Sequence, residues 1–189
     1  MFLTVANKLT ICRILVIPFF VLALFYYSPD RDCFRWIALG IFLFAGILDL
    51  LDGYVARKFH QETKLGALLD PLADKILLVS AYICLYKLSV IFDTVRLPLW
   101  FVVGVVIREI VLLFGITVMR LVKGGTTINP TLLGKLTTFC QMFAVLGILA
   151  RWRFTDLFWY LVLTLVIVSG FDYIYKGIKQ FNNRLTAQC

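Results

Sequence analysis

The imidazole and thiol groups that many catalytic and metal-binding sites use are scarce in this chain. Its 189 residues include one histidine, His60, and five cysteines that lie too far apart in sequence to form a CxxC pair or a metal-binding motif. Charged residues are also few, at 16% of the chain, whereas a soluble domain has about 25%. Hydrophobic residues instead reach 61%, and the mean hydropathy is +0.92. This composition excludes an ordinary soluble domain and indicates a membrane protein.

Long apolar stretches account for most of the chain, and a helix needs about 20 such residues to cross a bilayer. Six stretches predict six transmembrane helices: 14–27, 36–51, 68–92, 97–121, 131–149 and 157–175. The first two are short, so we expect their helices to extend beyond the apolar run. Because Arg13 interrupts the apolar segment near the start of the chain and no small-residue cleavage site follows that segment, we interpret it as a permanent helix. Residues 1–189 are predicted to form a single all-α integral membrane domain.

The orientation in the membrane follows from where the basic residues fall, since cytoplasmic loops carry the excess of lysine and arginine. One side receives Lys8, Arg13, Arg57, Lys58, Lys64, Arg120, Lys123, Lys135, Lys176, Lys179 and Arg184. The other side receives Arg31, Arg35, Lys87, Arg96, Arg151 and Arg153. Both termini and the 53–67 loop are therefore predicted to be cytoplasmic. The net charge of +8 does not indicate nucleic-acid binding, because no basic stripe with stacking aromatics accompanies it.

Four aspartates lie at the facing ends of the second and third apolar stretches. They are Asp49, Asp52, Asp70 and Asp74. A carboxylate at membrane depth costs roughly 2.5–3.5 kcal/mol, so we expect something to neutralise these charges. Spacings of three and four residues place each pair on one helical face. The small residues Gly53, Ala56 and Gly66 share those faces and would leave room for a ligand.

A short basic loop joins the two helices, so the four carboxylates can converge near the cytoplasmic end. Carboxylates without histidine or thiolate form a hard oxygen site suited to Mg²⁺, Mn²⁺ or Ca²⁺. Two such ions about 3.5–4 Å apart are suited to phosphoryl displacement. Two alternatives remain open: structural ion pairs with Arg57, Lys64 and Lys75, and a cation transporter that uses the carboxylates as its ion path.

The spacing of these residues resembles the signature of the CDP-alcohol phosphotransferase family. The fixed positions are Asp49, Asp52, Gly53, Ala56, Arg57, Gly66, Asp70 and Asp74. Upstream, Asn7, Leu9, Thr10 and Arg13 are similar to the family's entry to its first helix, although Ala6 stands where proline is usual. Six helices with cytoplasmic termini agree with the resemblance. The family is commonly dimeric, so a homodimer is expected.

The resemblance implies a mechanism in which a phospho-alcohol passes from a CDP-alcohol to an acceptor hydroxyl and CMP is released. The four aspartates would hold two Mg²⁺ or Mn²⁺ ions, and Asp74 would act as general base. The CDP-alcohol would be bound by Gly53, Ala56, Arg57 and Gly66. A site at the cytoplasmic membrane boundary suits CDP-diacylglycerol, whose acyl chains stay in lipid while the nucleotide stays in water.

The acceptor is indicated by two charged positions outside the signature. Arg108, followed by Glu109, and Lys135 after Gly134 suit a phosphate-bearing acceptor. These positions resemble those of phosphatidylglycerophosphate synthases, whose acceptor is glycerol 3-phosphate. One position differs, because Ile116 stands where a second arginine is expected. The run 129–138 is also similar to cardiolipin synthases of this family, whose acceptor is phosphatidylglycerol. Arg108 and Glu109 could instead be a structural pair. A bacterial plasma membrane is the expected location.

Overall fold

The structure is a computed structural model that describes residues 5–58, 66–89, 97–123, 132–153 and 155–185, with side chains over 9–51, 72–88, 97–115, 132–153, 155 and 157–172. Its elements are α1 (Val5–Phe25), a 3₁₀ turn (Pro29–Arg31), α2 (Cys33–Lys58), α3 (Gly66–Ser89), α4 (Leu99–Lys123), α5 (Leu132–Leu149) and α6 (Thr155–Leu185). None of the described residues forms a strand. The predicted all-α class is therefore confirmed.

Helix boundaries depart from the apolar stretches mainly where polar residues continue a helix. As expected for the two short stretches, α1 begins at Val5 and α2 runs on to Lys58. The prediction for the last helix was wrong, since α6 continues to Leu185 rather than ending at residue 175. Lysine, glutamine and arginine are good helix formers, so a helix can extend past the end of its apolar segment.

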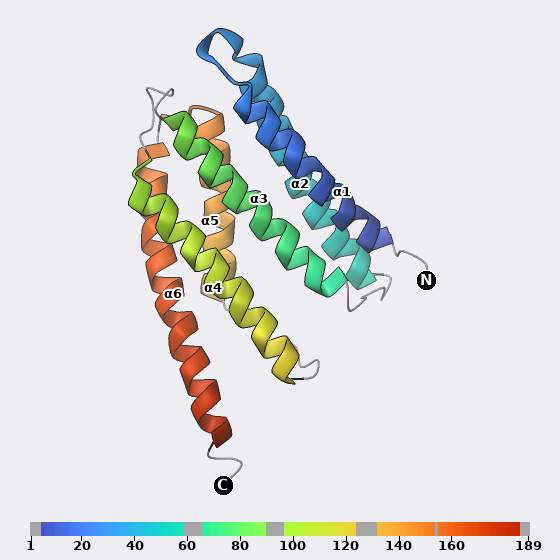
Figure 1. Cartoon of the computed structure of the whole chain (residues 1–189), viewed down its shortest axis with the longest axis vertical. Helices are drawn as coiled ribbons and strands as arrows, with labels where there is room; N and C mark the ends of the chain where they lie inside the picture. The colour runs from blue at the N-terminus through green and yellow to red at the C-terminus, as the bar shows by residue number, and fades with distance from the viewer. Residues whose placement is uncertain (1–4, 59–65, 90–96, 124–131, 154, 186–189) are drawn as a thin grey trace.

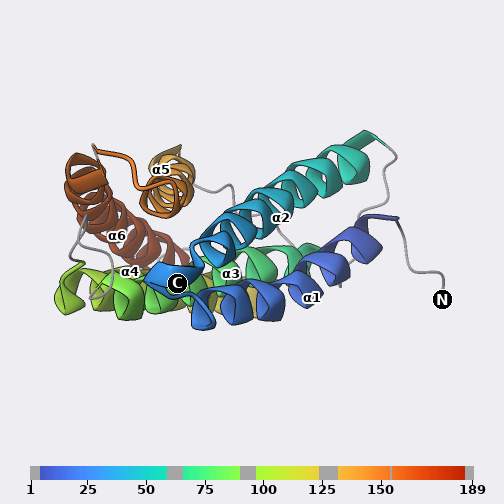
Figure 2. The same cartoon turned by 90° about the horizontal axis from the view of Figure 1, so that it is seen from above.

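The six helices form two layers, with α1, α3 and α4 in one and α2, α5 and α6 in the other (Figure 2). The start of α1, the ends of α2, α4 and α6, and the start of α3 point toward the same end of the molecule (Figure 1). α1 packs against both α2 and α3. Contact between the two aspartate-bearing helices therefore runs in part through α1, which the sequence did not indicate.

Aromatic rings link the helices inside the bundle. Phe20 of α1 meets Phe42 of α2 with ring centroids 5.6 Å apart. Phe101 of α4 lies 5.8 Å from Tyr82 of α3 and 5.6 Å from Trp159 of α6, measured between ring centroids. The two pairs that involve Phe101 are edge-to-face, and such pairs stabilise a fold by about 0.5–1.5 kcal/mol each beyond the burial of their surface.

The outer surface is apolar, while charged side chains are buried within the bundle. Several of the largest apolar residues are strongly exposed, including Leu15, Phe19, Phe25, Leu50, Phe114, Leu132, Leu157 and Phe171. A soluble protein rarely exposes apolar surface on this scale. By length and composition, Cys33–Leu51 and Leu132–Leu149 could each cross a bilayer, and Leu9–Phe25 and Leu157–Asp172 are shorter apolar helical stretches. The surface is that of a protein embedded in lipid.

Candidate active site

Asp49 of α2 is held by an arginine from the neighbouring helix. Its Oδ1 lies 2.5 Å from Nη1 of Arg13, whose side chain is almost fully enclosed. Arg13 shares a buried face of α1 with Ile17, Phe20 and Leu24, at the spacings of three and four residues that bring side chains onto one side of a helix. The Asp49 carboxylate remains more than one third exposed. One side of it is therefore neutralised and the other is accessible.

Asp74 of α3 is more enclosed, and one of its oxygens has no hydrogen-bond partner. Oδ2 lies 3.6 Å from Nζ of Lys75. Oδ1 is buried and accepts no hydrogen bond from any side chain or backbone group that the structure describes. The charges of Asp49, Arg13 and Glu109 also lie within electrostatic range of this carboxylate. A buried oxygen without a partner is rare in folded proteins and marks a place where a ligand can bind.

Lys75 joins three helices through its ammonium group. Nζ lies 2.8 Å from Oε2 of Glu109 on α4. It also donates a hydrogen bond of 3.1 Å to Oγ1 of Thr138 on α5. Glu109 is fully enclosed and forms a second ion pair with its neighbour Arg108. We call Arg13, Asp49, Asp74, Lys75, Arg108 and Glu109 the site cluster.

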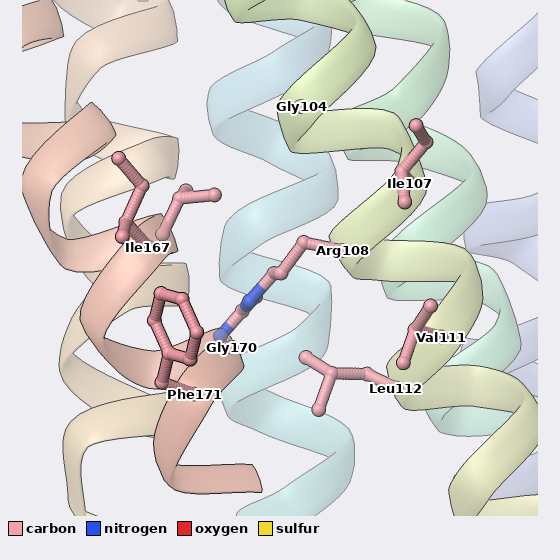
Figure 3. A pocket seen from close by; sticks show the side chains of 9 residues that line it. Gly104, Ile107, Arg108, Val111, Leu112, Ile167, Gly170 and Phe171 are labelled. Carbon is pink, nitrogen blue, oxygen red and sulfur yellow. The ribbon is translucent and has the colours of Figure 1, made fainter. Parts of the chain in front are cut away.

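Arg108 reaches from α4 toward α6 (Figure 3). Nη1 lies 3.5 Å from Oε1 of Gln141 on α5, whereas Nε and Nη2 are buried with no hydrogen-bond partner among the described groups. The side chain borders a cavity of about 290 Å³ between α4 and α6 and reaches toward Gly170 (Figure 3). The remaining lining residues are Gly104, Ile107, Val111, Leu112, Val166, Ile167, Gly170 and Phe171. The cavity is therefore apolar apart from Arg108.

Several residues of the predicted site lie outside the described side chains. Those of α2 are Asp52, Gly53, Ala56 and Arg57, and those of α3 are Gly66 and Asp70. Their backbone is helical, as the spacing argument requires. Lys135 lies on α5 with an exposed side chain and does not line the cavity beside Arg108. The structure thus brings Asp49, Asp74 and Arg108 into one connected region and leaves Lys135 apart from the cavity.

The described half of the aspartate set fits a hard divalent cation. Asp74 presents a buried oxygen without a partner, and Asp49 is close enough for the two charges to interact. Oxygen donors of this kind match Mg²⁺ or Mn²⁺. Within the described side chains no group of three histidine, cysteine or acidic residues is close enough to hold a metal. A complete site would therefore need Asp52 and Asp70.

One of the ion pairs expected for a structural role of the aspartates is present. Asp74 does contact Lys75, but the closest partner of Lys75 is Glu109. Asp49 pairs with Arg13, which the sequence did not suggest as its partner. Arg57 and Lys64 lie outside the described side chains. A signal for the missed pairs existed, because a basic residue inside an apolar helix needs a buried acid nearby.

A second charged group lies at the opposite end of the bundle, and we call it the loop cluster: Tyr27, Asp32, Arg35 and Arg151. Nε and Nη2 of Arg35 donate to the two oxygens of Asp32 at 2.8 and 2.6 Å, and Nη1 donates to the Leu149 carbonyl at 2.6 Å. Nη2 of Arg151 donates to the Tyr27 hydroxyl at 2.6 Å. The bonds from Arg35 hold the pKa of Asp32 below its ordinary value. This cluster ties the α1–α2 connection to the end of α5.

The fold and the site cluster together define the class: an all-helical membrane protein with a charged site between its helices. The family model described as CDP-alcohol phosphatidyltransferase matches residues 3–170, which include all eight signature positions. The chain belongs to the CDP-alcohol phosphatidyltransferase family. The resemblance seen in the sequence is confirmed.

Several named members of this family are similar to the chain in sequence. The chain is 33% identical over 196 residues to the CDP-diacylglycerol--glycerol-3-phosphate 3-phosphatidyltransferase of Bacillus subtilis (strain 168), which covers 90% of this chain and 93% of the relative. It is 34% identical over 174 residues to the protein of the same name from Haemophilus influenzae, with 90% and 88% covered. It is 40% identical over 141 residues to the probable phosphatidylglycerophosphate synthase of Mycobacterium tuberculosis (strain CDC 1551 / Oshkosh). That match spans 74% of this chain and 63% of the mycobacterial relative.

Proposed function

We propose that this protein transfers the phosphatidyl group of CDP-diacylglycerol to a hydroxyl of glycerol 3-phosphate, forming phosphatidylglycerophosphate and releasing CMP. The observation that carries the proposal is the buried, unpartnered oxygen of Asp74, in a chain that belongs to a phosphatidyltransferase family. Relatives that match about nine tenths of the chain are named for glycerol 3-phosphate, which supports this acceptor.

Two Mg²⁺ or Mn²⁺ ions would be held by Asp49, Asp52, Asp70 and Asp74. When bound, they would neutralise the diphosphate and the charge that develops on the departing CMP. Arg13 would hold the Asp49 carboxylate in position through its ion pair. The enclosed position of Asp74 would keep bulk water from competing with the acceptor.

The reaction is a displacement at phosphorus. The acceptor oxygen forms a bond to the phosphorus that carries diacylglycerol, and the bond from that phosphorus to the CMP oxygen breaks. Asp74 orients the acceptor hydroxyl and takes its proton, which then passes to water. A positioned carboxylate of this kind contributes about 10²–10⁴-fold to rate.

Substrate recognition would be divided between the signature and the later helices. Gly53 and Ala56 would leave room for the cytidine, Gly66 would also contribute to binding the CDP-alcohol, and Arg57 would face the phosphates. Arg108 and Lys135 would bind the phosphate of the acceptor, since arginine and lysine both pair with phosphate oxygens. The two unpartnered nitrogens of Arg108 support this role.

The membrane placement is also part of the proposal. Six transmembrane helices follow from the apolar stretches, whereas cytoplasmic termini and an active site at the cytoplasmic boundary follow from the distribution of basic residues. The relatives reported above come from bacteria, which supports a bacterial plasma membrane. A homodimer is expected from the family.

The experiment that tests the proposal is an acceptor screen. Purified protein in detergent is given CDP-diacylglycerol and Mg²⁺ or Mn²⁺, and CMP release is followed with glycerol 3-phosphate, phosphatidylglycerol, serine or inositol phosphate. Release with glycerol 3-phosphate is the expected result. Release only with phosphatidylglycerol would identify a cardiolipin synthase. None of the relatives reported above is named for phosphatidylglycerol as acceptor.

The metal dependence is tested in the same assay by adding EDTA, which should stop CMP release, and then restoring excess Mg²⁺ or Mn²⁺. A protein that releases no CMP with any acceptor would contradict the proposed activity. A cation transporter, the alternative from another class, would then be examined by metal uptake into liposomes.

A further inference from the structure

Lys75 is a buried cation at the junction of three helices, and neither the signature nor the proposed acceptor site gives it a role. Its side chain is about one tenth exposed. It lies on α3 directly after Asp74, with Glu109 of α4 and Thr138 of α5 as its other partners. A lysine at membrane depth costs roughly 2.5–3.5 kcal/mol unless it is paired. Its position therefore depends on these contacts.

The Lys75 ammonium lies closer to Glu109 than to Asp74, and this difference in distance indicates a role for the lysine. Nζ lies 2.8 Å from Oε2 of Glu109 but 3.6 Å from Oδ2 of Asp74. Glu109 thus holds the ammonium, and the ammonium in turn faces one oxygen of Asp74. The other oxygen, Oδ1, is buried and unpartnered among the described groups. The arrangement orients the Asp74 carboxylate without using the oxygen that a substrate or cation would need.

Glu109 connects this arrangement to the proposed acceptor side. It is fully enclosed between two cations, Lys75 and Arg108. Arg108 continues the chain of contacts to Gln141 of α5, and the Gln141 carbonyl accepts a hydrogen bond of 3.2 Å from the Tyr82 hydroxyl of α3. Polar networks of this kind fix the relative positions of the helices that carry them.

We propose that Lys75, held by Glu109 and Thr138, is a positioning residue that sets the orientation of the Asp74 carboxylate relative to the acceptor site. This inference rests on the proposed function, in which Asp74 receives the acceptor hydroxyl. It goes beyond that function by assigning a role to the pair formed by Lys75 and Glu109. A purely structural ion pair is the competing explanation, since buried pairs can often be replaced by neutral residues without loss of stability.

The test separates these two explanations with a neutral double variant. Lys75→Met with Glu109→Gln removes the charges of Lys75 and Glu109 together, and the glutamine oxygen can still accept the hydrogen bond that Arg108 donates to this position. Lys75→Arg is the conservative variant that keeps the charge. Lys87→Met is the matched control, because Lys87 is an exposed lysine in the last turn of the same helix. Each variant is purified in detergent and compared with the wild type in thermal unfolding, steady-state CMP release and Mn²⁺ binding by electron paramagnetic resonance.

If Lys75 positions Asp74, the double variant unfolds at nearly the wild-type temperature while kcat falls by about 10–100-fold, the usual effect of losing a group that orients a metal ligand. The KM for CDP-diacylglycerol changes little, and Mn²⁺ affinity falls by about 10-fold or more. Lys75→Arg recovers most of kcat, and Lys87→Met matches the wild type.

A double variant with wild-type kcat and Mn²⁺ affinity would overturn the inference and make the pair structural. A double variant that loses stability and activity together, with Mn²⁺ affinity per folded molecule unchanged, would overturn it as well. If the wild type itself releases no CMP, the proposed function fails, whereas Mn²⁺ binding by the variants still decides the role of Lys75.

Discussion

The two charged clusters differ in how completely their polar atoms are bonded. In the loop cluster both oxygens of Asp32 and three nitrogens of Arg35 have partners. In the site cluster Oδ1 of Asp74 and both Nε and Nη2 of Arg108 are buried without hydrogen-bond partners among the described groups. Arg35 and Arg108 are almost equally buried. For these two arginines, the contrast therefore reflects the hydrogen bonds they make and not how deeply they are buried.

This difference separates stabilisation from function. A buried arginine whose three nitrogens all have partners, such as Arg35, contributes to stability and has fewer donors left for a ligand. An unpartnered buried group lowers stability by about 1–3 kcal/mol, and such groups persist mainly where function requires them. Substitutions in the site cluster should therefore change activity, and those in the loop cluster should change stability.

The largest expected effect comes from Asp74→Asn. It removes the carboxylate that would bind metal and receive the proton, and metal stabilisation is worth several kcal/mol, so CMP release should fall by about 10³-fold or more. The thermal unfolding temperature should stay near that of the wild type, because a partly unsatisfied charge is being removed. Asp30→Asn, at an exposed position, is the control. If the variant keeps more than about one tenth of the wild-type activity, Asp74 does not have the functional role that its unpartnered oxygen indicates.

Arg108→Ala is expected to act on the acceptor. Losing hydrogen bonds from a charged donor costs about 1.5–3 kcal/mol, which corresponds to a rise of about 10–100-fold in the KM for glycerol 3-phosphate. The KM for CDP-diacylglycerol should change far less. Steady-state kinetics with each substrate varied in turn give both constants. An equal change in both would make Arg108 a structural residue like Arg35.

Arg35→Ala is expected to lower stability and to leave the activity of the folded enzyme unchanged. It breaks the paired bonds to Asp32 and the bond to the Leu149 carbonyl, so we expect a loss of about 1.5–3 kcal/mol in the free energy of unfolding. The kcat of the folded enzyme should be unchanged. Denaturant unfolding in detergent measures the loss, with Arg31→Ala on the exposed 3₁₀ turn as control. A fall in kcat with unchanged stability would reverse the assignment of the two clusters.

The smallest expected effect is a dependence of stability on acid. Hydrogen bonds from Arg35 lower the pKa of Asp32 from its ordinary value of 3.8, so the folded state binds this proton less readily than the unfolded state. The contribution of Asp32 is complete above its ordinary pKa and is lost as the pH falls through the lowered value. The unfolding temperature of the wild type should therefore drop more steeply below about pH 4 than that of Asp32→Asn. Equal slopes would show that Asp32 is no more protected than an exposed carboxyl.

The predictions made from the sequence agree best with the structure where they rest on the spacing of residues along the chain. The positions of the aspartates predicted two helices with shared faces, and α2 and α3 are helical through all four of them. The length of α6 was not predictable from hydropathy, because the membrane limits the apolar segment and not the helix. The pairing of Asp49 with Arg13 was not predictable either, because it depends on α1 lying against α2.

The class of the protein, the order of its helices and the residues of the family signature could all be predicted from the sequence. These follow from composition and from local periodicity, which need no knowledge of distant contacts. Which charged side chains pair with each other depends instead on how the helices pack. Lys75 and Glu109 lie on different helices, and their ion pair of 2.8 Å exists because α3 and α4 pack together. The free energy of a buried charge depends on its surroundings, and those are set by the packing of helices that are distant in sequence.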